Sequence, residues 1–71
     1  MENDSRIYKF IIFCLEHYRQ FRHITAMEAL TSFRQTSAFQ YLADGYPVLH
    51  TQSKDYIVAD IDDFILNHSS K

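Results

Sequence analysis

The sequence has very little glycine, proline or cysteine, with one residue of each among 71, and it has no tryptophan. A single glycine excludes a glycine-rich loop that cradles phosphate. A single cysteine excludes a disulfide within the chain and a zinc site built on a cysteine pair. Because glycine and proline punctuate secondary structure, their scarcity predicts a helix-rich chain with one sharp turn at Gly45-Tyr46-Pro47.

Long apolar runs and a strong excess of either charge are also missing. The longest unbroken apolar run, Phe10 to Leu15, spans six residues, whereas a membrane-spanning helix needs about 20. Seven Lys and Arg against nine Asp and Glu give a formal charge of −2, which excludes a general polyanion binder. The segment Met1 to Asp4 lacks the cations that open a secretory signal. We therefore expect a cytoplasmic protein with no membrane segment.

The apolar content is sufficient for one small core. Hydrophobic residues make up 46% of the chain and include six Phe and five Tyr. The length fits one domain, residues 1–71, and a unit of this size buries only about 60% of the surface of its unfolded chain. We therefore expect it to depend on a protein partner or on self-association, a dimer included.

The first predicted element is a helix capped by Asp4 or Ser5 and running to about Phe21. At 3.6 residues per turn, Cys14 lies within the apolar face, which predicts a buried core residue and not a reactive thiol. Phe13 lies instead in the middle of the polar stripe. It is either an ordinary exposed aromatic residue or the anchor of an interface. The apolar face contains Ile7, Ile11, Cys14, Tyr18 and Phe21.

Two capping boxes follow in the middle of the chain. Thr25–Glu28 predicts the start of a short helix, and Ser37–Gln40 predicts the start of a second one. The second helix is expected to stop at Asp44-Gly45, because glycine suits the left-handed position after a helix. Two short helices in succession predict a helix-turn-helix pair. The buried side of the first of them is expected to contain Met27, Leu30 and Phe33.

The sequence after the turn allows two interpretations. Val48–Thr51 and Tyr56–Val58 are rich in β-branched and aromatic residues, which favours a short β-hairpin followed by a helix capped by Asp60. The alternative is a helix that begins near Asp55, because apolar residues from Ile57 onward also keep helical spacing. The sequence therefore predicts a mostly α fold with a helix-turn-helix core, a wing-like hairpin and a C-terminal helix, or else an all-α fold.

Two resemblances arise from these segments. Ile24 to Leu66 is similar to the small winged helix-turn-helix units of excisionases and mercury-resistance-type regulators. The whole chain more specifically resembles a family of small uncharacterised bacterial domain proteins, through Gly-Tyr-x-Val-Leu-His-Thr-Gln at 45–52 and Tyr-Ile-Val-x-Asp-Ile at 56–61. That family has no established activity, and its members are often encoded beside a predicted ADP-ribosyltransferase-like protein. This resemblance implies an antitoxin-like or accessory role.

The polar residues form no pattern typical of catalysis or metal binding. No spacing of Ser, His and Asp defines a catalytic triad. The acids at 60–63 lack the glycine and the final glutamate of a calcium loop. We therefore expect no enzyme activity, no metal and no cofactor. The histidines are widely spaced with no pair four residues apart: His17, His23, His50 and His68.

Charge also weighs against DNA binding by a single chain. The predicted recognition helix, Ser37 to Asp44, contains no Lys or Arg, and residues 42–71 carry two Lys against five Asp, a net −3. Such a surface repels phosphate. A DNA-binding regulator is therefore the alternative function, and a non-catalytic protein–protein interaction module is the favoured one.

Four residues are the candidates for that interaction. Phe13 is the first, and the other three are expected to line one polar-aromatic patch. For His50 the alternative is a half-buried side chain that is hydrogen-bonded to the turn or to Thr51. The four candidate interaction residues are Phe13, Tyr46, His50 and Tyr56.

Overall fold

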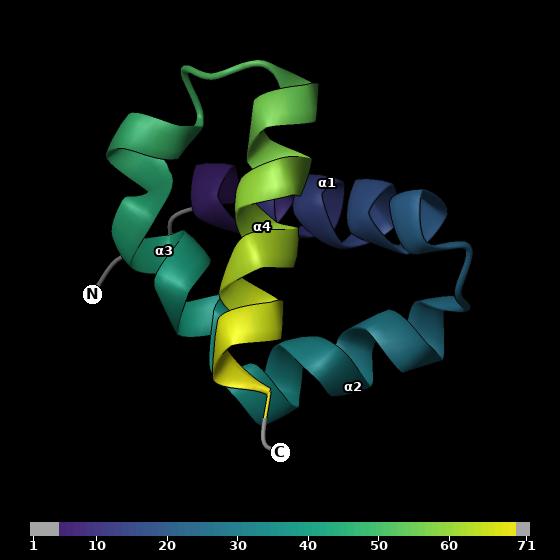
Figure 1. Cartoon of the computed structure of the whole chain (residues 1–71). Coiled ribbons are helices and arrows are strands. Elements are labelled where there is room, and N and C mark those ends of the chain that lie inside the picture. The colour runs from purple at the N-terminus through teal and green to yellow at the C-terminus, as the bar shows by residue number, and fades with distance from the viewer. Residues whose placement is uncertain (1–4, 70–71) are drawn as a thin grey trace.

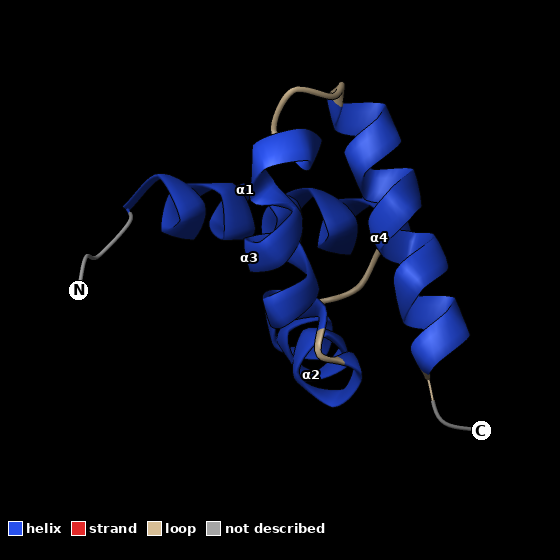
Figure 2. Cartoon of the chain, turned by 90° about the vertical axis from the view of Figure 1, so that its left-hand side faces the viewer, coloured by secondary structure: helices blue, strands red, loops and turns tan. Residues whose placement is uncertain are grey.

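The computed structural model describes residues 5–69, which form four helices joined by short loops. In Figure 1, α4 crosses in front of α1, α3 lies to one side, and α2 runs below. Each helix packs against the other three. Figure 2 shows only helix and loop in the described part of the chain, which confirms the mostly α prediction in its all-α form. The helices are α1 (Ser5–Arg22), α2 (Ala26–Thr36), α3 (Ala38–Leu49) and α4 (Lys54–His68).

The centre of the core takes one large side chain from each helix. Cys14 of α1 is completely buried, as predicted, and burial raises the pKa of its thiol to about 12. A thiol held protonated in this way is unreactive, which agrees with a packing role. The four side chains are Cys14, Phe33, Leu42 and Ile61.

The start of α2 confirms one predicted cap and corrects the predicted buried face. Thr25 Oγ1 accepts a hydrogen bond from the Glu28 N–H at 3.0 Å, and Glu28 Oε1 accepts one from the Thr25 N–H at 2.9 Å. Met27, which was expected inside, is 68% exposed, whereas Ala29 is fully buried. The prediction for Met27 was wrong, because α2 turns the small Ala29 side chain inward, and a small residue lets a helix pack closely.

The second predicted capping box does not form. Ser37 has φ 65°, a left-handed conformation, and its side chain makes no capping hydrogen bond. Its backbone N–H instead donates to the Phe33 carbonyl and ends α2. Because one residue closes α2 and opens α3, it cannot adopt the extended backbone that an N-cap serine uses.

The predicted helix end at Gly45 is also wrong, since α3 continues through Gly45 and Pro47 to Leu49. Pro47 removes one intrahelical hydrogen bond. Burial favours the longer helix, because Tyr46 packs its ring on Phe10 with centroids 5.3 Å apart and Leu49 enters the core. Gly45 fits here because a Cβ would lie only 3.0 Å from Leu49 Cδ1.

The predicted hairpin is wrong, and the helical alternative is correct. Residues 52–55, which separate the two predicted strands, contain the N-cap of α4. There Ser53 Oγ accepts a hydrogen bond from the Tyr56 N–H at 3.1 Å. Asp60 therefore lies inside α4 and does not cap it. Helical spacing places four β-branched side chains in the core, and this burial outweighs their preference for strands. They are Ile57, Val58, Ile61 and Ile65.

Candidate functional site: a groove between α1 and α4

A surface groove of about 360 Å³ lies where the first half of α4 passes the second half of α1. We call it the α1–α4 groove. Four of the seven lining side chains are polar or charged and three are apolar, a mixture that can contact both apolar and polar groups of a partner. The lining residues are His17, Gln20 and Phe21 of α1 and Lys54, Asp55, Val58 and Ala59 of α4.

The α1 wall of the groove continues a strip of rings four residues apart. Phe13 contacts His17 with ring centroids 4.4 Å apart, and Phe21 follows one turn further on. The strip spans about 12 Å, since a helix rises 1.5 Å per residue. Phe13 is 37% exposed, in agreement with its place in the polar stripe. Phe21 was expected on the buried face but is 53% exposed, because this end of α1 meets α4 at its edge.

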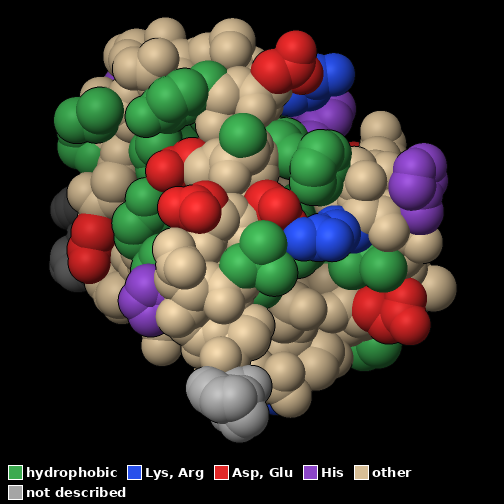
Figure 3. Space-filling model, viewed as in Figure 1, with side chains coloured by type: hydrophobic (Ala, Val, Ile, Leu, Met, Phe, Trp, Pro, Cys, Tyr) green, Lys and Arg blue, Asp and Glu red, His purple; other side chains and the backbone are tan. Residues whose placement is uncertain are grey.

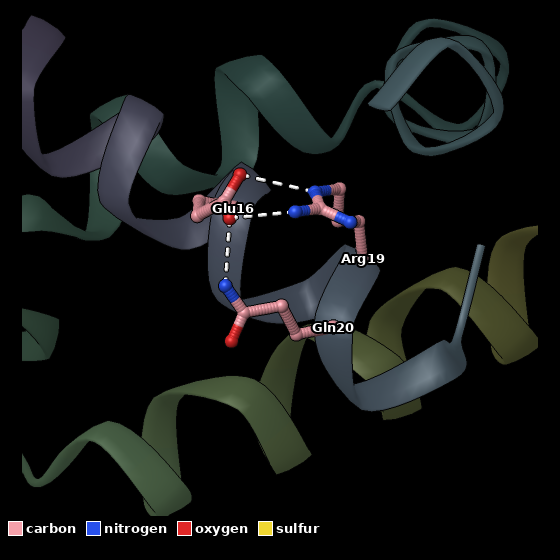
Figure 4. A network of polar contacts seen from close by, with 3 residues as sticks. All are labelled: Glu16, Arg19 and Gln20. Carbon is pink, nitrogen blue, oxygen red and sulfur yellow. Dashed lines mark hydrogen bonds and ion pairs between the residues drawn. The ribbon is translucent and has the colours of Figure 1, made fainter. Parts of the chain in front are cut away.

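A polar network holds the rim of the groove. Glu16 accepts hydrogen bonds from Arg19 Nε at 3.0 Å, Arg19 Nη2 at 2.8 Å and Gln20 Nε2 at 2.6 Å (Figure 4). Hydrogen bonds from Arg19 and then from Gln20 lower the pKa of Glu16. The ionised carboxylate therefore restrains the Gln20 amide at the rim.

The α4 wall has an apolar floor and charged residues at one end. Val58 is buried, and Ala59, the next residue of the lining, is exposed and has a small side chain. Lys54 and Asp55 lie in the first turn of α4. One turn after Val58, Asp62 Oδ1 accepts a hydrogen bond from Arg22 Nε at 2.7 Å, and this ion pair joins α4 to the end of α1.

The opposite side of α4 packs tightly against α3. The Tyr41 ring stacks on Phe64 with centroids 4.1 Å apart, and Phe64 stacks on His68 at 4.0 Å. The Tyr41 hydroxyl donates a hydrogen bond to Asp60 Oδ2 at 2.7 Å. This hydrogen bond, followed by burial, raises the pKa of Tyr41 to about 12. Asp60 therefore helps to hold α4 against α3.

The structure brings together two of the four predicted interaction residues. Tyr46 and His50 stack with centroids 4.3 Å apart, and His50 Nδ1 lies 2.6 Å from the Tyr46 carbonyl. A carbonyl only accepts, so Nδ1 carries the proton of this hydrogen bond. His50 is exposed, where a half-buried side chain was expected, and its hydrogen bond goes to Tyr46, a residue of the predicted turn, and not to Thr51. No ring contact within residues 5–69 joins Tyr56 or Phe13 to this pair.

The sequence did not identify His17 and Phe21 as site residues. Their spacing of four from Phe13 was the available signal, because it places all three side chains along one side of a helix. Over residues 5–69, no group of three or more His, Cys, Asp or Glu could hold a metal ion. In the same range, no helix is both long enough and apolar enough to cross a bilayer.

Four packed helices and no strand in the described part define a small all-helical fold. A family model described as "Protein of unknown function (DUF3791)" matches residues 9–68. The chain belongs to this family, which confirms the expected membership in a family of uncharacterised domain proteins. Comparison with curated proteins and with solved structures gave no significant match.

Proposed function

We propose that this protein is a non-catalytic protein–protein interaction module whose docking site is the α1–α4 groove. The observation that carries the proposal is the exposure of Phe21, at 53%, beside a groove floored by Val58. Aromatic side chains at the edge of a small apolar hollow are the usual centres of binding energy in protein interfaces.

The rest of the surface supports a role in binding. Single exposed apolar residues are normal, but a contiguous set marks an interaction site. Phe13, through its contact with His17, extends the groove along α1. Among residues 5–69 the exposed large apolar side chains are Tyr8, Ile12, Phe13, Phe21, Met27, Val48, Tyr56 and Leu66.

The proposed partner is a predicted ADP-ribosyltransferase-like protein of the kind that is often encoded beside members of the resembled family. In this proposal the protein acts as an accessory or antitoxin-like subunit that restrains the neighbouring enzyme. The groove is open and near the lower end of the size range for ligand pockets, about 300 Å³. Such a groove suits the insertion of a protruding side chain from a partner.

Size exclusion coupled to light scattering tests this proposal. The protein is measured alone and then with the product of the adjacent gene, and we expect a stoichiometric complex. Phe21→Glu should weaken that complex about tenfold or more, because it replaces the exposed aromatic ring at the groove with a charge. Met27→Glu, at an exposed apolar site on α2 away from the groove, is the control and should leave the complex unchanged. Two unshifted species for the unmodified proteins would contradict the proposal.

DNA binding is the competing sequence-based prediction. The α3 helix, in the place of a recognition helix, contains no Lys or Arg. It is joined to α2 through Ser37 alone, whereas a helix-turn-helix uses three or four residues. We expect no salt-dependent binding to the protein's own upstream DNA. A steep loss of affinity with salt in that titration would favour the regulator instead.

A further inference from the structure

The outward side of α4 carries a stripe of exposed residues with the spacing of a helix–helix seam. Tyr56, Ala59, Asp63 and Leu66 follow one another at intervals of three, four and three residues. All four are exposed, Tyr56 at 52% and Leu66 at 60%. This alternation is the spacing of the contact positions in a coiled coil. We call these four residues the α4 stripe. It spans about 15 Å and shares Ala59 with the α1–α4 groove.

The surroundings of the α4 stripe are acidic. Figure 3 shows acidic side chains among hydrophobic ones on the face that α4 crosses, and every acid of α4 is an Asp. The net charge of the stripe and its edges is −2 with the histidines neutral, which equals the formal charge of the whole chain. The acidic excess of the protein is therefore concentrated here. The charged residues are Arg22 and Lys54 against Asp55, Asp60, Asp62 and Asp63.

These acids do not all have the same role. Asp62 is paired with Arg22, and Asp60 accepts the Tyr41 hydroxyl proton in a hydrogen bond, so both serve the fold. Asp63 lies in the stripe itself, where its Oδ2 accepts a long hydrogen bond from the Asn67 amide at 3.4 Å. An exposed carboxylate at a seam position selects a partner helix with a cation opposite it.

We propose that the α4 stripe binds an amphipathic helix of the partner protein. The contact face of that helix combines apolar residues with Lys or Arg. This inference rests on the proposed interaction function and specifies the chemistry of the partner. Leu or aromatic residues of that helix pack on Tyr56, Ala59 and Leu66, and its cations face Asp55 and Asp63. Pairing of two α4 helices from two copies is opposed by charge, because each α4 carries one Lys against four Asp.

The experiment is an NMR titration of the isotopically labelled full chain with two synthetic helical peptides. One peptide combines Leu with Lys and the other combines Leu with Glu, each about 20 residues long so that a helix is stable. We expect the Leu–Lys peptide to shift backbone amides of residues 54–67, and the Leu–Glu peptide to leave them in place. Raised salt should weaken the binding.

Variants of the stripe make the test specific. Leu66→Ala should weaken Leu–Lys binding about fivefold or more, whereas Met27→Ala on α2 should not change it. Asp63→Lys combined with Asp55→Lys should reverse the preference between the peptides. Equal binding of both peptides, shifts confined to α1 or α2, or shifts at 54–67 that grow with protein concentration alone would each overturn the inference.

The two proposals fail separately. If the adjacent gene product forms a complex that Leu66→Ala and the double Lys variant leave intact, the partner chemistry is wrong while the interaction function stands. If the peptides bind as expected and no complex with the gene product forms, the choice of partner is wrong while the binding surface stands.

Discussion

The two sides of α4 are packed in very different ways. Toward α3, the Tyr41 ring stacks on Phe64 and its hydroxyl donates a hydrogen bond to Asp60. Ring stacking and this hydrogen bond therefore close the contact between α3 and α4. Away from α3, Leu66 is 60% exposed and the groove beside Ala59 is open. On that side the ion pair of Arg22 with Asp62 adds to the packing of α4 against α1.

This difference separates stability from binding within one helix. Contacts made inside the chain, as between Tyr41 and Phe64, lower the free energy of the folded state. Apolar surface that stays in water, as at Leu66, does not stabilise the folded chain. Such a surface contributes a favourable free energy only when a partner covers it. Substitutions on the closed side should therefore change unfolding, and substitutions on the open side should change binding.

The largest effect should come from Phe64→Ala on the closed side. The ring is half-buried between Tyr41 and His68, so its removal should cost about 2–3 kcal/mol of the free energy of unfolding. Leu66→Ala, two residues later on the open side, should stay within about 0.5 kcal/mol. Urea denaturation of both variants measures the contrast. Equal losses would show that the open side is also held by contacts within the chain.

A smaller effect is expected from Tyr41→Phe, which keeps the stacked ring and removes the hydroxyl. Loss of the hydrogen bond to Asp60 should cost about 1 kcal/mol at neutral pH. The folded-state pKa of Tyr41 is raised to about 12, above the value near 10 of an unfolded chain. The stabilisation is therefore complete below about pH 10 and is lost as the pH rises toward 12.

The pH dependence of the variant identifies the tyrosine's share of this loss. The pKa of Cys14 is raised from 9.0 to about 12 by burial, so its contribution falls in an overlapping range that begins at lower pH. The free energy of unfolding is measured between pH 8 and 12 for both proteins. Above pH 10 it should decrease less steeply with pH for Tyr41→Phe than for the unmodified protein. Identical slopes would place the whole alkaline loss on Cys14 and other groups.

Local signals in the sequence predicted the parts of the fold that local interactions determine. The Thr25–Glu28 capping box involves only four consecutive residues, and α2 begins there as predicted. The failures at Ser37, Gly45 and the 48–58 segment have a shared cause. In each case contacts between helices decide the outcome, and a single sequence does not show what Leu49 or Ile57 packs against.

The same reason explains what was found and missed at the candidate site. Phe13 was visible because an aromatic residue in a polar stripe breaks a pattern within one helix. The α4 stripe could not be predicted from a strand at Tyr56–Val58. In a strand, side chains two residues apart lie on the same face, so Tyr56 and Val58 would point the same way. In the helix they lie on different sides, Val58 inward and Tyr56 outward.

The smallest effect is expected from the ion pair that joins α1 and α4 on the open side. Its side chains keep 38% and 18% of their exposure, so water and salt screen the attraction. A double-mutant cycle with Arg22→Ala and Asp62→Asn should give a coupling free energy of about 0.5–1 kcal/mol that decreases as salt is raised. A coupling above about 2 kcal/mol that salt does not change would contradict the expectation that this surface pair is screened by water. A weak coupling would mean that the apolar packing of α4 against α1, and not the ion pair, holds these two helices together.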